Sequence, residues 1–160
     1  MQVIEDNINN NKSITFIGMP GAGKSYTSSY ISKKFNIPLV ELDEYIEKKY
    51  NNTLSQIFQK YGENEFKNIE CNAILDITFD KPKIISTGGS VIYYEKGMKH
   101  LKNSNNIIIY LKTDFETLKE RTENFTNRGI VFNNLKPIDL YNQRIKLYEK
   151  YADYIFTKII

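Results

Sequence analysis

Short apolar runs alternate with longer amphipathic segments along this chain. One run, "NIIIYL", is nearly continuous, which is typical of a strand buried on both faces. The predicted strands are residues 13–18, 38–42, 82–87, 106–111 and 154–159. The predicted helices are residues 23–35, 44–50, 53–62, 63–79, 114–122 and 137–151. This alternation predicts an α/β fold with three layers, in which helices cover both faces of a central parallel sheet of about five strands.

Polar residues mark several of the predicted helix ends. Thr53 with Gln56 reads as a capping box that opens one helix, and Gly62 is a natural stop for it. Thr113 with Glu116 reads as a second capping box. The polar segment 123–134 interrupts the helical pattern before the last long helix. We therefore expect ordered helices on either side of a polar loop.

Composition narrows the class of protein. The 160 residues are 41% hydrophobic and show neither a repeat nor a linker, so we expect one domain, residues 1–160. The net charge of +3 is spread along the chain, which argues against nucleic-acid binding, and no apolar run approaches a membrane span. A lone cysteine, Cys71, cannot form an internal disulfide. We expect a cytoplasmic protein, a monomer that acts on a small molecule.

The segment "GMPGAGKS", residues 18–25, fits the phosphate-binding pattern G-x-x-x-x-G-K-[ST] between a predicted strand and a predicted helix. Its glycines let backbone N–H groups point inward around an anion, and the helix N-terminus adds positive potential. Lys24 can reach the β- and γ-phosphates, and the Ser25 hydroxyl can ligate Mg²⁺. The alternative is a glycine-rich turn with an incidental lysine. We predict a nucleotide site that includes Gly21, Ala22, Gly23, Lys24, Ser25 and Tyr26.

Two acidic residues near the second predicted strand are candidates for phosphoryl-transfer chemistry. Asp43 lies at the strand end, where open parallel sheets bind ligands, and could orient or deprotonate an acceptor hydroxyl. It could also cap the helix 44–50, and the two roles are compatible. Glu41, two residues earlier, would share its face and could support Mg²⁺ directly or through water, unless it is an ordinary acid at a strand end.

Two arginines flank the polar interruption. Arg121 and Arg128 lie where a cationic lid over the transferred phosphoryl group would place them, and they define a lid at about residues 121–134. The alternative is a pair of exposed loop arginines.

The pattern as a whole resembles the shikimate kinase family, small P-loop kinases of the nucleoside monophosphate kinase-like fold. The segment "ELDEYIEKKYNNTLSQIFQKYGENEFKNIE" is similar to the family's acceptor-binding segment, here about residues 43–79. "ISTGGS" is similar to its glycine-rich turn, "RTENFTNRGI" to its lid, and "RIKLYEKYADYIF" to its last helix and strand. The resemblance implies transfer of phosphate from ATP, with Mg²⁺, to shikimate, giving shikimate 3-phosphate in aromatic amino acid biosynthesis.

The resemblance also implies roles for residues at the acceptor end. Asp43 would bind the acceptor hydroxyls and serve as base, and Gly88 and Gly89 would offer backbone donors. Arg144 would grip the acceptor's carboxylate, with Lys67 on its other side.

At the nucleotide end the resemblance makes Lys24 and Arg128 catalytic. Arg128 would bridge the phosphates and the acceptor, and Arg121 would lie along the adenine. Glu41 would stand in the position that supports Mg²⁺.

Three departures from the family pattern concern specificity. Lys67 replaces an arginine, and a flexible ammonium is not equivalent to a planar guanidinium that binds a carboxylate through two hydrogen bonds. Ser90 replaces the third glycine of the turn, which either reduces room or adds a hydrogen bond. The lid reads Arg-Gly-Ile at residues 128–130 where the family usually has Arg-Pro-Leu. Two alternatives therefore stay open: a kinase of this fold with another acceptor, such as a sugar acid, hydroxy amino acid or nucleotide, and a non-catalytic nucleotide-binding regulator.

Overall fold

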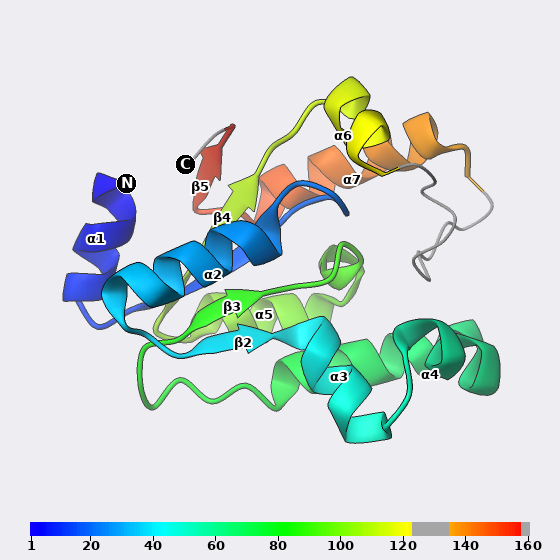
Figure 1. Cartoon of the computed structure of the whole chain (residues 1–160), viewed down its shortest axis with the longest axis horizontal. Coiled ribbons are helices and arrows are strands. Elements are labelled where there is room, and N and C mark those ends of the chain that lie inside the picture. The colour runs from blue at the N-terminus through cyan, green and yellow to red at the C-terminus, as the bar shows by residue number, and fades with distance from the viewer. Residues whose placement is uncertain (123–134, 158–160) are drawn as a thin grey trace.

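A five-stranded parallel sheet forms the centre of the molecule (Figure 1). The computed structural model describes residues 1–122 and 135–157. The strands are β1 (Ser13–Ile17), β2 (Leu39–Glu41), β3 (Ile84–Ser86), β4 (Asn106–Leu111) and β5 (Tyr154–Phe156). Their order in the sheet is β2-β3-β1-β4-β5, and every neighbouring pair is parallel. The predicted α/β class and strand number are confirmed.

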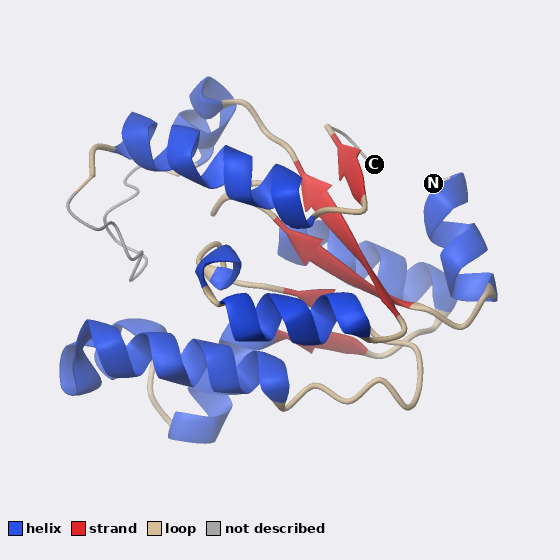
Figure 2. Ribbon diagram, turned by 180° about the vertical axis from the view of Figure 1, so that it is seen from behind, coloured by secondary structure: helices blue, strands red, loops and turns tan. Residues whose placement is uncertain are grey.

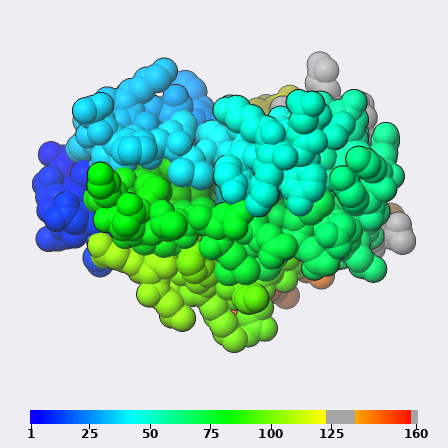
Figure 3. All heavy atoms as spheres, turned by 90° about the horizontal axis from the view of Figure 1, so that it is seen from below, coloured from blue at the N-terminus to red at the C-terminus, as the bar shows by residue number. Residues whose placement is uncertain are grey.

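Helices cover both faces of this sheet. They are α1 (Gln2–Asn9), α2 (Lys24–Phe35), α3 (Leu42–Tyr50), α4 (Leu54–Leu75), the 3₁₀ turn η1 (Val91–Tyr93), α5 (Glu95–Asn103), α6 (Phe115–Arg121) and α7 (Pro137–Tyr151). Figures 1 and 2, taken from opposite sides, show α2 on one face and α5 with α7 on the other. The helices α3 and α4 pack together at the end of the molecule opposite α1 (Figure 3).

The core runs through the middle strands. All five residues of β1 and all six of β4 are buried, as the continuous apolar pattern of β4 predicts. Fully burying one isoleucine side chain stabilises a fold by about 1.5–3 kcal/mol. Ile14 and Ile108, both fully buried, therefore help to hold the two central strands in a fixed register, and the loops that follow these strands start from a rigid base.

One predicted capping box is confirmed and one is wrong. Thr53 and Gln56 bond reciprocally: the Gln56 N–H donates to Thr53 Oγ1 at 3.2 Å, and the Thr53 N–H donates to Gln56 Oε1 at 2.9 Å. At the start of α6 the N-cap is Asp114, not Thr113, because the Asp114 carboxylate accepts the Thr117 N–H at 2.9 Å. A carboxylate next to the helix dipole caps at least as well as a hydroxyl one residue earlier.

Gly62 breaks the helical geometry without ending the element. Its φ of 79° is non-helical, so the predicted stop is present, but the helix resumes directly and the two predicted segments form the kinked helix α4. Ile77, which falls within the predicted helix 63–79, is buried beyond the C-terminal end of α4 at Leu75.

Two helices, α1 and α5, were not predicted from the sequence pattern. The helix α1 buries Ile4 and packs on β1, and α5 buries Met98 and Leu101 while Gly97 approaches Ile74. Both helices are amphipathic, but each is short and has only a few apolar residues among polar ones, so they were missed. Within the described ranges, no helix is long and apolar enough to cross a membrane.

Candidate active site

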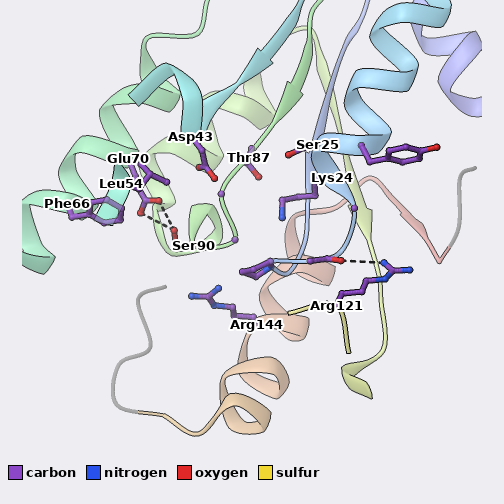
Figure 4. A pocket seen from close by; sticks show the side chains of 16 residues that line it. Lys24, Ser25, Asp43, Leu54, Phe66, Glu70, Thr87, Ser90, Arg121 and Arg144 are labelled. Carbon is purple, nitrogen blue, oxygen red and sulfur yellow. Dashed lines mark hydrogen bonds between the residues drawn. The ribbon is translucent and has the colours of Figure 1, made fainter. Parts of the chain in front are cut away.

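A pocket of about 360 Å³ opens at the carboxyl ends of the central strands (Figure 4). Its walls come from the loop before α2 and the first turn of α2, the first turn of α3, the start and middle of α4, the turn after β3, and the helices α6 and α7. In open parallel sheets, ligands bind at this edge because loops and helix N-termini converge there. Segments far apart in the chain thus form one pocket.

The predicted phosphate-binding loop forms one end of the pocket. Gly23 caps α2 with a φ of 89°, a left-handed conformation that glycine adopts without steric cost. The side chain of Lys24 is buried, and its Nζ donates to the carbonyl oxygens of Gly18 at 2.9 Å and Met19 at 3.0 Å. These bonds hold the ammonium over the loop, beside the N-terminus of α2. The arrangement suits an anionic phosphate.

Ser25 and Glu41 meet beside this loop. The Ser25 hydroxyl donates to Glu41 Oε2 at 3.2 Å. Burial raises the pKa of Glu41, while hydrogen bonds from Ser86 and Ser25 oppose that rise. A hydroxyl and a carboxylate are oxygen donors of the kind that Mg²⁺ prefers. Within the described ranges, no group of three or more His, Cys, Asp or Glu residues could hold a metal ion. Mg²⁺ in nucleotide sites is commonly bound by one or two protein oxygens together with substrate phosphates and water.

The prediction that Glu41 and Asp43 share one face of the same strand is wrong. Glu41 ends β2 and is the N-cap residue of α3, although its side chain makes no capping hydrogen bond. Asp43 belongs to the first turn of α3, so it is neither a residue of the same strand nor the helix cap. The chain turns into the helix earlier than the apolar pattern indicates, and this turn directs Asp43 into the pocket (Figure 4).

Four of the predicted acceptor residues lie together at the other end of the pocket: Asp43, Gly88, Gly89 and Arg144. A Cβ placed on Gly88 would lie 3.2 Å from Asp43 Oδ1. A Cβ placed on Gly89 would lie 3.1 Å from Arg144 Nη1 and only 2.7 Å from Pro20 Cδ. The absence of side chains on these two glycines therefore lets a carboxylate, a guanidinium and the phosphate-binding loop approach the backbone of the turn closely.

Arg144 is a buried charge that faces this pocket from α7. Its side chain is only 1% exposed, its Nε donates to Tyr93 Oη at 3.3 Å, and its guanidinium carbon lies 5.3 Å from the centre of the Tyr93 ring. A guanidinium held in this way is preorganised to bind a planar anion such as a carboxylate.

Lys67 does not join Arg144 in the pocket. Its Nζ pairs with Glu63 one turn earlier on α4, and the side chain borders a separate surface hollow with Asn68 and Tyr93. The preceding residue, Phe66, lines the main pocket. Because successive helical residues are rotated by about 100°, the residue after Phe66 faces a different direction.

Sequence reasoning missed Glu70, a buried acid that also lines the pocket. The Ser90 hydroxyl lies 3.0 Å from Glu70 Oε1 and 2.9 Å from Oε2, and the Tyr94 hydroxyl donates to Oε2. Burial is the main reason that the pKa of Glu70 rises to about 7. The signal was present: Glu70 occupies the apolar face of α4, four residues after Phe66, and a buried acid on such a face needs partners. The pocket also contains Pro20, Leu54, Phe66 and Thr87, which were not predicted as site residues. Ser90, predicted to reduce room or add a hydrogen bond in the turn, lines the pocket and forms that bond with Glu70.

A second pocket, of about 530 Å³, adjoins the phosphate-binding loop on the side of α6 and β5. Ala22 lines it, and Gly23, Tyr26 and Arg121 line both pockets. Arg121 Nη1 donates to the Gly21 carbonyl at 3.4 Å. All predicted nucleotide-binding residues thus border one pocket or the other. Arg128 lies outside the described residues, as does most of the predicted lid.

Comparisons with known proteins agree with this geometry. A model of the family "Shikimate kinase" matches residues 20–159. A shikimate kinase of Dictyoglomus turgidum is 38% identical over 148 residues, covering 89% of this chain and 86% of the relative. One from Staphylococcus aureus strain JH9 is 35% identical over 148 residues, covering 91% of this chain and 84% of the relative.

A solved structure gives the same result at the level of the fold. Shikimate kinase from Acinetobacter baumannii in complex with shikimate superposes with a TM-score of 0.81 and 27% identity, covering 93% of this chain and 84% of that one. Sequence and structure therefore lead to the same conclusion, that this chain belongs to the shikimate kinase family.

Proposed function

We propose that this protein is an ATP-dependent shikimate kinase, which transfers the γ-phosphoryl group of ATP to a hydroxyl of shikimate and releases ADP and shikimate 3-phosphate. The observation that carries the proposal is that Lys24, Asp43 and Arg144 line one pocket in a chain of this family. Cytoplasmic location, a monomeric state and one kinase domain whose segment 43–79 binds the acceptor remain parts of the proposal.

The nucleotide is proposed to bind along both pockets, with its phosphates at the first and its base at the second. Lys24, already held over the loop, would exchange its carbonyl partners for phosphate oxygens. Ser25 and Glu41 would hold Mg²⁺ directly or through water. When bound, the ion would neutralise charge on the β- and γ-phosphates. Arg121, which borders both pockets, would lie along the adenine.

The acceptor is proposed to bind between α3, α7 and the turn at Gly88 and Gly89. Arg144 would take the carboxylate, because it is the buried guanidinium on this side of the pocket. Asp43 would accept a hydrogen bond from the attacking hydroxyl and remove its proton as the oxygen bonds to phosphorus. Arg128, from the predicted lid, would stabilise the charge on the transferred group.

A kinase of this fold with a different acceptor is the second candidate, and one observation favours it. Lys67, which the family likeness places at the carboxylate, borders another hollow and pairs with Glu63. If Arg144 alone binds the carboxylate, the pocket discriminates less strongly for an acid than a pocket with two cations would.

The test is an assay of ADP formation with purified protein, ATP, Mg²⁺ and one acceptor at a time: shikimate, gluconate, serine or a nucleoside monophosphate. We expect kcat/KM for shikimate to exceed the others by at least about 100-fold, since a pocket that pairs buried polar groups rejects molecules that leave them unpaired. Mass spectrometry should find a monophosphorylated acceptor. Preferential turnover of another acceptor would contradict the proposal, and a Lys24→Ala preparation controls for contaminating kinases.

A further inference from the structure

The hydroxyl groups of Ser90 and Tyr94, two residues that follow Gly88 and Gly89 in the chain, hold the Glu70 carboxylate. Ser90 lies within 3.0 Å of both carboxylate oxygens, and Tyr94, just before α5, donates to Oε2. All three side chains are more than nine-tenths buried. A single hydroxyl proton serves both Ser90 contacts, so Oε1 keeps unused capacity to accept a hydrogen bond.

That unused capacity faces the acceptor end of the pocket. The same Cβ position on Gly88 lies 3.2 Å from Asp43 Oδ1 and 3.4 Å from Glu70 Oε1, so the two carboxylates converge on the open face of one glycine (Figure 4). Both acids also border a cavity of about 10 Å³ beneath the turn, together with Tyr94 and Val91. The Glu70 carboxylate is therefore held by Ser90 and Tyr94 on one side, and on the other side its Oε1 faces the acceptor end of the pocket.

We propose that Ser90 and Tyr94 are positioning residues that fix the Glu70 carboxylate beside Asp43, and that they thereby set the affinity of the pocket for the hydroxyls of the acceptor. This inference rests on the proposed function for the identity of the acceptor. Ser90 stands where the family pattern has the third glycine of the turn, so its hydroxyl is a departure from that pattern. Lys67 lies on the same helix as Glu70 but pairs with Glu63. The described hydrogen-bond partners of the Glu70 side chain are therefore the hydroxyls of Ser90 and Tyr94.

The surroundings of Glu70 determine its charge near neutral pH. Burial raises its pKa to about 7, the hydrogen bonds from Tyr94 and Ser90 lower it, Asp43 on α3 raises it and Arg144 on α7 lowers it. Burial also raises the pKa of Tyr94, so this hydroxyl stays a donor. Loss of the Ser90 hydroxyl removes a stabilising partner of the ionised carboxylate. Glu70 then stays protonated to higher pH and accepts hydrogen bonds less well.

The experiment compares wild type, Ser90→Ala and Tyr94→Phe by titration with shikimate between pH 6 and 9, with ADP present. Wild-type affinity should increase as pH rises through about 7, the range in which Glu70 ionises. In Ser90→Ala we expect the midpoint to move up by roughly one pH unit and the dissociation constant at pH 7 to rise about fivefold, because a hydrogen bond to a charged group is lost. The affinity for ADP and kcat at saturating shikimate should hardly change.

Two controls separate positioning from general damage. Ser104→Ala removes a hydroxyl that donates to the His100 carbonyl at 2.6 Å, away from the pocket, and should leave the pH profile unchanged. In a Glu70→Gln background, Ser90→Ala should no longer move the profile, because the group that titrates is gone. A profile that still moves in that background would overturn the proposal.

A second measurement does not depend on the acceptor. The carboxyl ¹³C resonance of Glu70, assigned with Glu70→Gln, should titrate at higher pH in Ser90→Ala than in wild type. An unchanged titration would overturn the positioning role even in a protein that phosphorylates shikimate. A wild-type protein that does not bind shikimate would instead contradict the proposed function, while the ¹³C titration would still decide the role of Ser90.

Discussion

The two ends of the active-site pocket are built in different ways. At the nucleotide end, one stretch of eight residues between β1 and the first turn of α2 supplies the loop, the lysine and the hydroxyl. At the acceptor end, Asp43, Glu70, Gly88 and Arg144 come from four elements that lie far apart in the chain. The comparison teaches that phosphate binding is a local property of the backbone, whereas acceptor recognition depends on how helices pack on the sheet.

The strongest test of the local end is Lys24→Ala. We expect kcat to fall about a thousandfold, because the ammonium contacts charge that develops during transfer. The melting temperature should change little, since the Lys24 ammonium donates to the loop carbonyls of Gly18 and Met19 and faces the pocket rather than the apolar core. Steady-state kinetics and thermal unfolding measure the two effects. The exposed Lys33→Ala on the same helix is the control, and activity close to wild type in Lys24→Ala would contradict the role of the loop.

At the assembled end the largest expected effect is that of Asp43→Asn. Loss of a general base typically lowers turnover by about a hundredfold or more, while the affinity for nucleotide should be kept. The measurement is kcat with saturating shikimate, together with ADP binding. If only KM for shikimate rises, Asp43 binds the acceptor without removing its proton.

Glu70 at the assembled end gives a further test, because burial of its ionised carboxylate lowers the stability of the fold. Since the pKa of Glu70 is raised from 4.5 to about 7 in the folded protein, its contribution to stability is fully present below pH 4.5 and is lost as pH rises through 7. The loss amounts to up to about 3 kcal/mol. Denaturant unfolding of wild type and Glu70→Gln should give a difference that grows over this interval in favour of the variant. A difference independent of pH would show that Glu70 titrates normally.

A milder change at the assembled end is Arg144→Lys. The variant keeps the charge and loses the planar pair of donors, so shikimate should bind about tenfold more weakly. The constants for ATP should stay within about twofold. Calorimetric titration of the two ligands measures both effects. Equal losses for ATP and shikimate would show that Arg144 supports the whole pocket, including the phosphate-binding end.

The smallest expected effect is that of Lys67→Arg. Because Lys67 borders a separate hollow and pairs with Glu63, the longer guanidinium should change shikimate affinity by less than about twofold. The same calorimetric titration applies. A clear gain in affinity would instead show that the helix α4 turns this residue toward the acceptor when the substrate binds.

Much of the fold could be predicted from patterns that are local in the chain. The strands β1 and β4 follow from continuous apolar runs, the start of α4 from Thr53 and Gln56, and the loop before α2 from its glycines and Lys24. Each signal depends on backbone geometry or on the spacing of neighbouring residues. The helices α1 and α5 were missed although both are amphipathic, because each is only eight or nine residues long and mostly polar.

The sequence by itself determined the phosphate-binding loop, the five strands and the helices other than α1 and α5 along the chain, and the family to which the chain is similar. Only the tertiary structure decided which acidic and basic side chains face the acceptor. It turned Asp43 into the pocket from a helix, placed Lys67 outside it, and buried Glu70 against Ser90 and Tyr94. The reason is that a phosphate is bound by backbone N–H groups of one contiguous segment, whereas the direction and charge of a buried side chain depend on neighbours that folding brings from elsewhere in the chain.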